Sequence, residues 1–263
     1  MRLVTFDRRG HRRLGAILGG GVVDLPDLVG HPAFPATLEA LVSRNGGTVL
    51  DAAREALARD EAARFVVRDA TLLPPVYPES LRSDDAMDGV RALVGSGAEV
   101  GWPRGAGWLE YRPKIAAIVR RSVRGLSSEE VPDAIFGYTL VSDWAAHDAT
   151  GMPAPAASPL PVAVGPCVVT ADELDPQGTI LTVRVDGEQR LRSSLNGTTH
   201  HLAAAIARAS KIHALGPGEA FAAGPFGAGP HDYDRQLWPG ALVELEAEGI
   251  GTLTTRLSRA VAA

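Results

Sequence analysis

Short apolar segments, in which hydrophobic residues alternate with polar ones or run together, recur along the chain and predict a mostly β protein. Residues 2–6, 13–18 and 21–24 are three such segments, separated by glycine- and arginine-rich turns. Segments of this length and spacing are typical of consecutive antiparallel strands. The chain is therefore expected to open with a small β-meander.

Two helical patterns follow the meander. Leu38 and Leu41 fall on one helical face, and Leu50, Ala53 and Ala58 fall on one face of a second helix. These spacings predict two amphipathic helices that pack against the meander.

Residues 65–73 return to a strand pattern, which Pro74-Pro75 ends. We therefore expect residues 1–72 to form a small α+β domain and residues 73–263 to form a second, larger domain. Because residues 1–72 bring no set of polar side chains together, the chemistry is expected in the larger domain.

The longest buried-strand pattern in that domain, residues 136–141, leads directly into polar residues. Ser142, Asp143 and His147 follow it. A carboxylate at the end of a buried strand is costly unless a cation, a metal or several donors lie beside it. Asp143 is therefore the first candidate for chemistry. The alternative is that Asp143 caps a turn or short helix that begins at Trp144.

A second strand pattern, residues 108–119, carries two cationic side chains. Alternation places Arg112 and Lys114 on one face of this strand and Tyr111 on the other. Pro113 has no N–H group to donate, so this part of the strand is expected at a sheet edge or beside a bulge. Two cations on one face are also typical of a solvated edge, and the sequence leaves both interpretations open.

Toward the C-terminus the pattern predicts one helix and two strand pairs. Asp186-Gly187 is expected to form the turn of a hairpin, and a helix is expected to run from Thr198 or Thr199 through Ser210. Residues 241–247 and 251–257 are expected to pair with each other.

Composition narrows the class of protein. The chain has 263 residues, of which 45% are hydrophobic and 22% charged, as in an ordinary globular protein. Its net charge of −5 gives no basic surface for nucleic acid. No apolar run is long enough to cross a bilayer and no signal peptide is evident, so a cytoplasmic location is expected. The single cysteine, Cys167, excludes an intrachain disulfide and lies among apolar residues that favour a buried thiol.

A set of short motifs in a fixed order resembles the fumarylacetoacetate hydrolase family along the whole chain. The matching segments are residues 74–76 (PPV), 80–82 (SLR), 92–97 (ALVGSG), 109–111 (LEY), 136–148 (FGYTLVSDWAAHD), 165–170 (GPCVVT), 172–174 (DEL), 215–218 (LGPG) and 249–253 (GIGTL). Each motif alone is weak evidence, whereas the set in this order is strong. The resemblance implies an α+β, mostly β fold: a twisted β-roll of mixed sheets behind a small N-terminal domain, assembled as a homodimer.

The resemblance also implies a site, from which this chain departs. In the family, two glutamates and one aspartate hold a divalent cation, usually magnesium. Here the glutamate positions are Arg112 and Lys114, and only Asp143 remains. The family's arginine is replaced by His147. Because one carboxylate beside two cations does not supply the oxygen ligands that Mg²⁺ requires, we expect no metal and no other cofactor.

Two further family positions are altered. The family's lysine falls near Ser158, and a glycine–threonine pair in a C-terminal loop is Gly224-Pro225. We expect Asp143, Lys114 and His147 to be catalytic, and Arg112, Tyr111, Ser158 and Gly224 to contact the substrate. In this hypothesis Lys114 takes the place of the metal and pairs with Asp143, or holds a substrate carboxylate or enolate.

The favoured function is a metal-independent enzyme for a small anionic or polycarbonyl compound. Asp143 or His147 would move a proton during hydrolysis, hydration, decarboxylation or cyclisation of a tailored metabolite.

Two alternatives remain open at this point. In the first alternative, the chain is an inactive family member that binds a ligand or pairs with an active paralogue. In the second, the chain is an ordinary magnesium-dependent hydrolase of carbon–carbon bonds in 1,3-dicarbonyl compounds, and the metal is held elsewhere, for example by Asp84 and Asp85.

Overall fold

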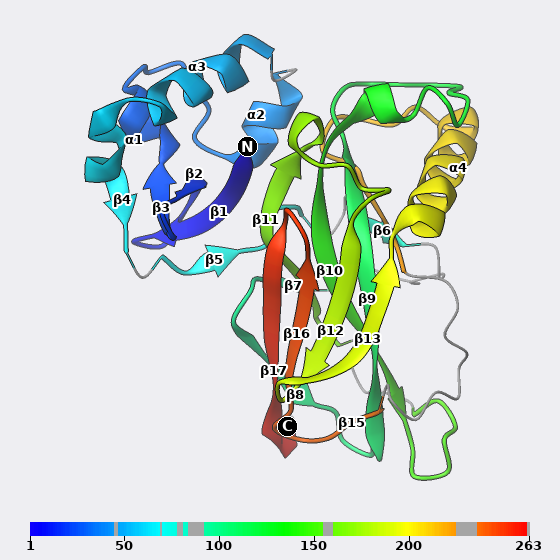
Figure 1. Cartoon of the computed structure of the whole chain (residues 1–263). Helices are drawn as coiled ribbons and strands as arrows, with labels where there is room; N and C mark the ends of the chain where they lie inside the picture. The colour runs from blue at the N-terminus through cyan, green and yellow to red at the C-terminus, as the bar shows by residue number, and fades with distance from the viewer. Residues whose placement is uncertain are drawn as a thin grey trace.

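Two β-sheets make up most of the molecule, which we describe from a computed structural model (Figure 1). The structure describes residues 1–44, 47–68, 70–77, 81–83, 92–154, 160–224 and 236–261. Within these residues the larger sheet has the strand order β4 (Val66–Val67), β3 (Gly21–Asp24), β2 (His11–Leu18), β1 (Arg2–Arg8), β11 (Val162–Thr170), β10 (Ile135–His147), β9 (Trp108–Val119), β14 (Ala220–Ala223) and β6 (Leu81–Ser83).

Three short strands join this sheet beside its main path. They are β15 (Gln236–Leu237) on β9, β5 (Leu72–Leu73) on β1 and β7 (Leu93–Val94) on β11. The second sheet has the order β13 (Glu188–Ser194), β12 (Ile180–Val185), β16 (Leu242–Ala247), β17 (Gly251–Val261) and β8 (Ala98–Trp102). Both sheets mix parallel and antiparallel pairs, since β7, β6 and β8 each run parallel to their neighbour.

Helices are few. The α-helices are α1 (Leu25–Val29), α2 (Leu38–Ser43), α3 (Gly47–Leu57) and α4 (Asn196–Ile212), and the 3-10 helices are η1 (Asp60–Phe65), η3 (Pro132–Ala134) and η4 (Ala171–Glu173). None of the described helices is long and apolar enough to cross a membrane. The expected α+β, mostly β class is confirmed.

The N-terminal region contains the predicted meander, β1 to β3, with α1 to α3 packed on it (Figure 1). Leu38 and Leu41 are buried as the helical pattern predicts, whereas Ala58 lies beyond the end of α3 and is exposed. β1 pairs antiparallel with β11, so the meander continues into the large sheet. The domain boundary at residue 72 stays a prediction.

The strand expected over residues 65–73 is wrong. Phe65 ends the 3-10 helix η1, and the segment then forms two short strands on different partners, with β4 on β3 and β5 on β1. The segment crosses the meander from one side to the other, which a single straight strand cannot do.

The later elements agree with the sequence pattern. The β12–β13 hairpin turns at Asp186 and Gly187, both with positive φ, and β16 pairs with β17. The C-terminal helix begins at Asn196, two residues earlier than the first expected cap.

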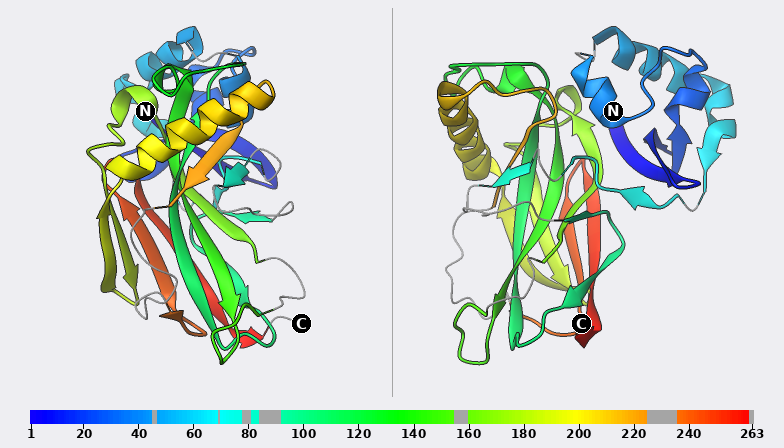
Figure 2. Two further views of the ribbon diagram at one scale, coloured as in Figure 1. Left: turned by 90° about the vertical axis from the view of Figure 1, so that its right-hand side faces the viewer. Right: turned by 180° about the vertical axis from the view of Figure 1, so that it is seen from behind.

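Two apolar cores lie on opposite faces of β9, β10 and β11. One contains Tyr111 and Leu140 and is shared with strands of the second sheet, which lies in front of β9 and β10 in Figure 1. The other contains Ile118 and Val141 and is shared with β1 and the N-terminal helices. Figure 2 shows these layers from two further sides, with α4 lying across one end of the strands.

β9 and β10 are the strands that position the candidate site. They pair antiparallel over almost their full length, from Val119 opposite Ile135 to Trp108 opposite His147. β10 therefore does not end at Val141 as expected, and the alternative in which Asp143 caps a helix at Trp144 is wrong. The strand continues because the ladder with β9 supplies its backbone hydrogen bonds.

Candidate active site

One face of the β9–β10 pair changes from apolar to charged along its length. Ile118 and Val141 lie on this face where the N-terminal region covers it. Further along, Arg112 stands directly opposite Asp143, and Lys114 stands opposite Val141. Side chains directly opposite each other in a ladder share a face, and diagonal neighbours are within reach of long side chains. Lys114 is thus placed diagonally next to Asp143.

Lys114 and Asp143 form a buried ion pair. The Lys114 Nζ atom lies 3.5 Å from Asp143 Oδ2, and the two side chains are only 3% and 1% exposed. Lys114 also donates a hydrogen bond of 2.5 Å to the hydroxyl of Ser83 in β6. Asp143 Oδ1 accepts a 2.7 Å hydrogen bond from the backbone N–H of Trp144. These contacts compensate both charges where water has little access.

A second charged group lies beside this pair and centres on Glu110. Its Oε2 atom lies 3.6 Å from Arg112 Nη2 and 3.4 Å from His147 Nε2. The His147 ring stacks on Trp108 with centroids 4.0 Å apart and planes 8° apart, and its Nδ1 lies 3.3 Å from the Gly151 carbonyl oxygen. Both ring nitrogens thus lie close to oxygen atoms, and these contacts with the stacking fix the orientation of the ring.

The predicted site residues divide into those on this face and those elsewhere. Asp143, Lys114, Arg112 and His147 lie on the charged face, and the proximity of Lys114 to Asp143 is as predicted. Gly224 adjoins it, since a Cβ atom at this position would lie 3.0 Å from the Pro113 carbonyl oxygen and 3.7 Å from Lys114 Cγ.

The prediction for Tyr111 is wrong. Its ring is 1% exposed and belongs to the apolar core on the opposite face of β9. Because side chains alternate along a strand, Tyr111 and Arg112 point to different faces of β9, and Tyr111 is therefore excluded from the charged face. Ser158, Asp84 and Asp85 lie outside the described residues.

Pro113 lies in a locally unpaired part of β9. β14 pairs with residues 115–118 of β9 and β15 with residues 109–110, on the side away from β10. Within the described strands, the side of β9 at Pro113 therefore has no ladder partner. This local edge agrees with the prediction from the missing proline N–H.

Three residues of the site were missed in the sequence. Glu110 and Trp108 continue the alternation that already selected Arg112 and Lys114, so a period of two was enough to find them. Ser83 comes from a strand about thirty residues earlier in the chain, and no local pattern connects it with Lys114.

Asp148 and Cys167 are structural. The hydroxyl and backbone N–H of Thr150 donate hydrogen bonds to the Asp148 carboxylate and lower its pKa, which holds the turn after β10. Burial raises the pKa of the Cys167 thiol to about 12, and the thiol donates to the Ile250 carbonyl oxygen. The expected core thiol is confirmed.

The residues at the family's metal position do not fit a divalent cation. The ammonium of Lys114 lies 3.5 Å from the one remaining carboxylate, Asp143, and Arg112 is the ladder partner of Asp143 on β9. At about 4 Å and an effective dielectric near 20, repulsion between two unit charges is about 4 kcal/mol. Among the residues that the structure describes, no three His, Cys, Asp or Glu side chains are grouped so that they could hold one metal ion.

Solved structures share this architecture over nearly the whole chain. A fumarylacetoacetate hydrolase from Exiguobacterium antarcticum has a TM-score of 0.74 at 20% identity, covering 99% of this chain and 100% of that one. A maleylpyruvate hydrolase from Sphingobium has a TM-score of 0.73 at 23% identity, covering 98% and 99%. A 5-carboxymethyl-2-hydroxymuconate delta-isomerase from Mycobacterium smegmatis has a TM-score of 0.66 at 20% identity, covering 99% and 100%. The fold is therefore one that hydrolases and isomerases share.

The sequence itself identifies the family. The family model described as fumarylacetoacetate (FAA) hydrolase C-terminal matches residues 79–258. The protein belongs to the fumarylacetoacetate hydrolase family. An uncharacterized protein of Pyrococcus abyssi is 28% identical over 171 residues, covering 62% of this chain and 73% of the relative. An uncharacterized protein of Staphylococcus epidermidis is 26% identical over 247 residues, covering 79% and 78%.

The buried ion pair generates a stability prediction. Lys114→Ala leaves the Asp143 carboxylate without its cation in a buried position, and we expect the free energy of unfolding in urea to fall by about 3–5 kcal/mol. The matched control is Arg184→Ala, because the Arg184–Glu246 pair is 37% and 43% exposed. An exposed pair contributes about 0–1 kcal/mol, so equal losses in the two variants would contradict a buried, charged pair.

Proposed function

We propose that this protein is an enzyme that acts, without a divalent metal at Asp143, on a small anionic or polycarbonyl compound. The observation that carries the proposal is the buried Lys114–Asp143 pair at the metal position, with Arg112 on the same strand face. A fixed ammonium in this place supplies positive charge where the family relies on a metal.

Arg112 is the residue best suited to bind a substrate anion. Its side chain is 38% exposed, whereas that of Lys114 is 3% exposed. A guanidinium presents two parallel N–H groups to a carboxylate, and binding in this form fixes the orientation of the substrate. The Arg112 Nη2 atom lies 3.6 Å from Glu110 Oε2, which holds the guanidinium on the charged face.

Lys114 is suited to an electrostatic role. Its hydrogen bond with Ser83 and its pairing with Asp143 hold the ammonium in one position, as preorganised catalysis requires. In our proposal this charge stabilises an enolate or a polarised carbonyl oxygen of the bound compound.

His147 is suited to moving a proton. It is 14% exposed, and stacking on Trp108 with contacts to Glu110 and Gly151 fixes the plane of its ring. In our proposal the imidazole of His147 transfers a proton to or from the bound compound as a general acid or base. Charge stabilisation beside a proton donor serves hydrolysis, hydration, decarboxylation or cyclisation of a carbonyl compound.

The proposed metal independence predicts a specific response to magnesium. The melting temperature of the natural protein is expected to be the same in EDTA and in millimolar Mg²⁺, because Lys114 and Arg112 repel the cation. The double variant R112E/K114E places three carboxylates around the site and is expected to melt higher in Mg²⁺ than in EDTA. A magnesium-dependent rise in the natural protein would restore the ordinary metal-dependent hydrolase as the favoured function.

The role of Arg112 predicts a substrate preference. The test uses a panel of small dicarbonyl acids and their matched neutral dicarbonyl analogues. We expect the protein to bind and turn over the acids in preference to the neutral compounds. Arg112→Gln is expected to weaken acid binding by about 1.5–3 kcal/mol, the usual contribution of a charge-assisted hydrogen bond, and to leave the neutral compounds unchanged.

Arg184→Gln is the matched control, because Arg184 is equally exposed and lies in the second sheet. Binding without turnover would favour the inactive, ligand-binding alternative. Equal binding of acids and neutral analogues would contradict the role given to Arg112.

We also propose that the protein is a homodimer, as the family resemblance implies. Exposed Trp238 and Met152 leave apolar surface for a partner copy. Light scattering at tens of micromolar is expected to give twice the chain mass, and the monomer mass would contradict the proposal.

A further inference from the structure

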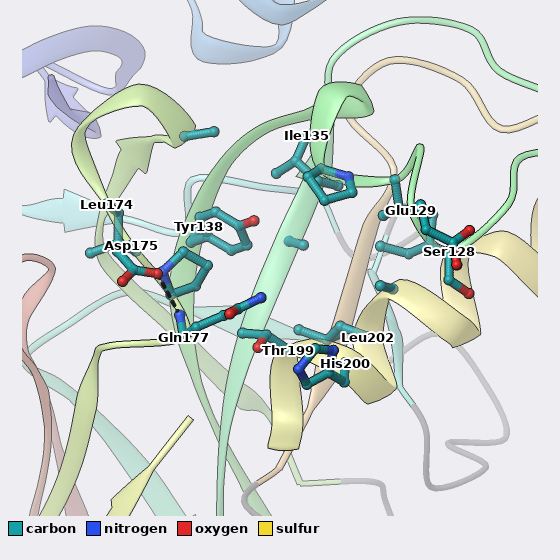
Figure 3. A pocket seen from close by; sticks show the side chains of 17 residues that line it. Ser128, Glu129, Ile135, Tyr138, Leu174, Asp175, Gln177, Thr199, His200 and Leu202 are labelled. Carbon is teal, nitrogen blue, oxygen red and sulfur yellow. Dashed lines mark hydrogen bonds between the residues drawn. The ribbon is translucent and has the colours of Figure 1, made fainter. Parts of the chain in front are cut away.

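A groove lies on the face of β9 and β10 opposite to the charged site. Its volume is about 490 Å³, and its walls come from α4 and from η4 with the loop after it. Its floor includes Ala117 of β9 and Tyr138 of β10, which stand opposite each other in the ladder. Figure 3 shows Tyr138 with other side chains of the lining. A volume in this range is typical of sites for small organic molecules.

The inner part of the groove is apolar apart from one hydroxyl. Ile135, Leu202 and Ile206 are buried residues of its lining. Tyr138 is 8% exposed, and among the described residues its hydroxyl has no hydrogen-bond partner. Burial raises the pKa of Tyr138 to about 12, so the hydroxyl stays protonated at neutral pH. A hydroxyl without a partner on a largely buried ring that lines the groove can give a hydrogen bond to a bound molecule.

The charge of the lining is negative. Asp175 and Glu129 are both exposed at its rim, and no lysine or arginine belongs to the lining. The Asp175 carboxylate adds to the effect of burial in raising the pKa of Tyr138. His200 lies in the first turn of α4, on a different wall from Asp175 (Figure 3).

We propose that this groove binds an apolar small molecule that carries a single protonated amine. The apolar body packs on Ile135 and Leu202 and takes a hydrogen bond from the Tyr138 hydroxyl, and the ammonium lies beside the Asp175 carboxylate, away from α4. The charged site on the other face of the same strands presents Arg112 and takes anions. The two faces of β9–β10 therefore select ligands of opposite charge.

Three probes with one indole body and different charge test the selectivity: tryptamine, tryptophol and indole-3-propionate. We expect isothermal titration calorimetry at pH 7 to show affinity that falls from tryptamine to tryptophol to indole-3-propionate. Tryptamine is expected to bind about tenfold more tightly than indole-3-propionate. Equal affinities, the reverse order, or no tryptamine binding at 10 mM would each overturn the proposal.

Substitutions then locate the binding. Asp175→Asn keeps the carbonyl oxygen that accepts from the Gln177 N–H, and is expected to weaken tryptamine by about two- to fivefold without affecting tryptophol. Glu99→Gln is the control, because it removes one exposed carboxylate from β8, outside the lining. Tyr138→Phe is expected to weaken tryptamine severalfold with an unchanged melting temperature.

A filling variant separates the groove from the charged site. Ala203 of α4 is partly buried in the lining, and Ala203→Leu is expected to abolish tryptamine binding while acid binding at Arg112 persists. Unchanged tryptamine binding in both Ala203→Leu and Asp175→Asn would place the amine elsewhere and overturn the proposal. Loss of acid binding alone, in Arg112→Gln, bears only on the proposed function.

Discussion

The ion pair between Lys114 and Asp143 is the constraint on which the arrangement of the site depends. Two charges that are 3% and 1% exposed remain in a folded protein only if each compensates the other. The pairing needs the β9–β10 register, which places Lys114 diagonally beside Asp143. A shift by one residue would turn Lys114 into the apolar core that Tyr111 occupies.

The same register gives the two faces of β9 and β10 different chemistry. Alternate residues face the core shared with the second sheet, where Ala117 and Tyr138 form the floor of a groove with acidic residues at its rim. The intervening residues point to the other face. On β9 this face is apolar where the N-terminal region covers it and charged from Lys114 to Glu110, where that cover ends. The N-terminal helices thus limit the charged face by covering the apolar part of it.

Strand periodicity predicted the face of Arg112 and Lys114, and the motif after residue 136 predicted Asp143, so the central pair was available from sequence. The course of β10 through Asp143 and His147 was not, because residues 142–147 contain no β-branched residue and their strand depends on the ladder with β9. Glu110 obeys the same periodicity and was overlooked. Ser83 reaches Lys114 only through the pairing of β6 with β14 and of β14 with β9, which no local pattern contains.

In our proposal the charge pattern reflects replacement of a metal site and not its decay. Loss of ligands without replacement would leave Asp143 as an isolated buried carboxylate, at a cost of several kcal/mol. Instead Lys114 pairs with Asp143, and Glu110 lies within reach of both Arg112 and His147. Glu110 is buried as well, with its side chain 9% exposed, so its contact with Arg112 also compensates a buried charge. Arg112 itself is 38% exposed, so its cation stays accessible from solvent and, in our proposal, binds the ligand.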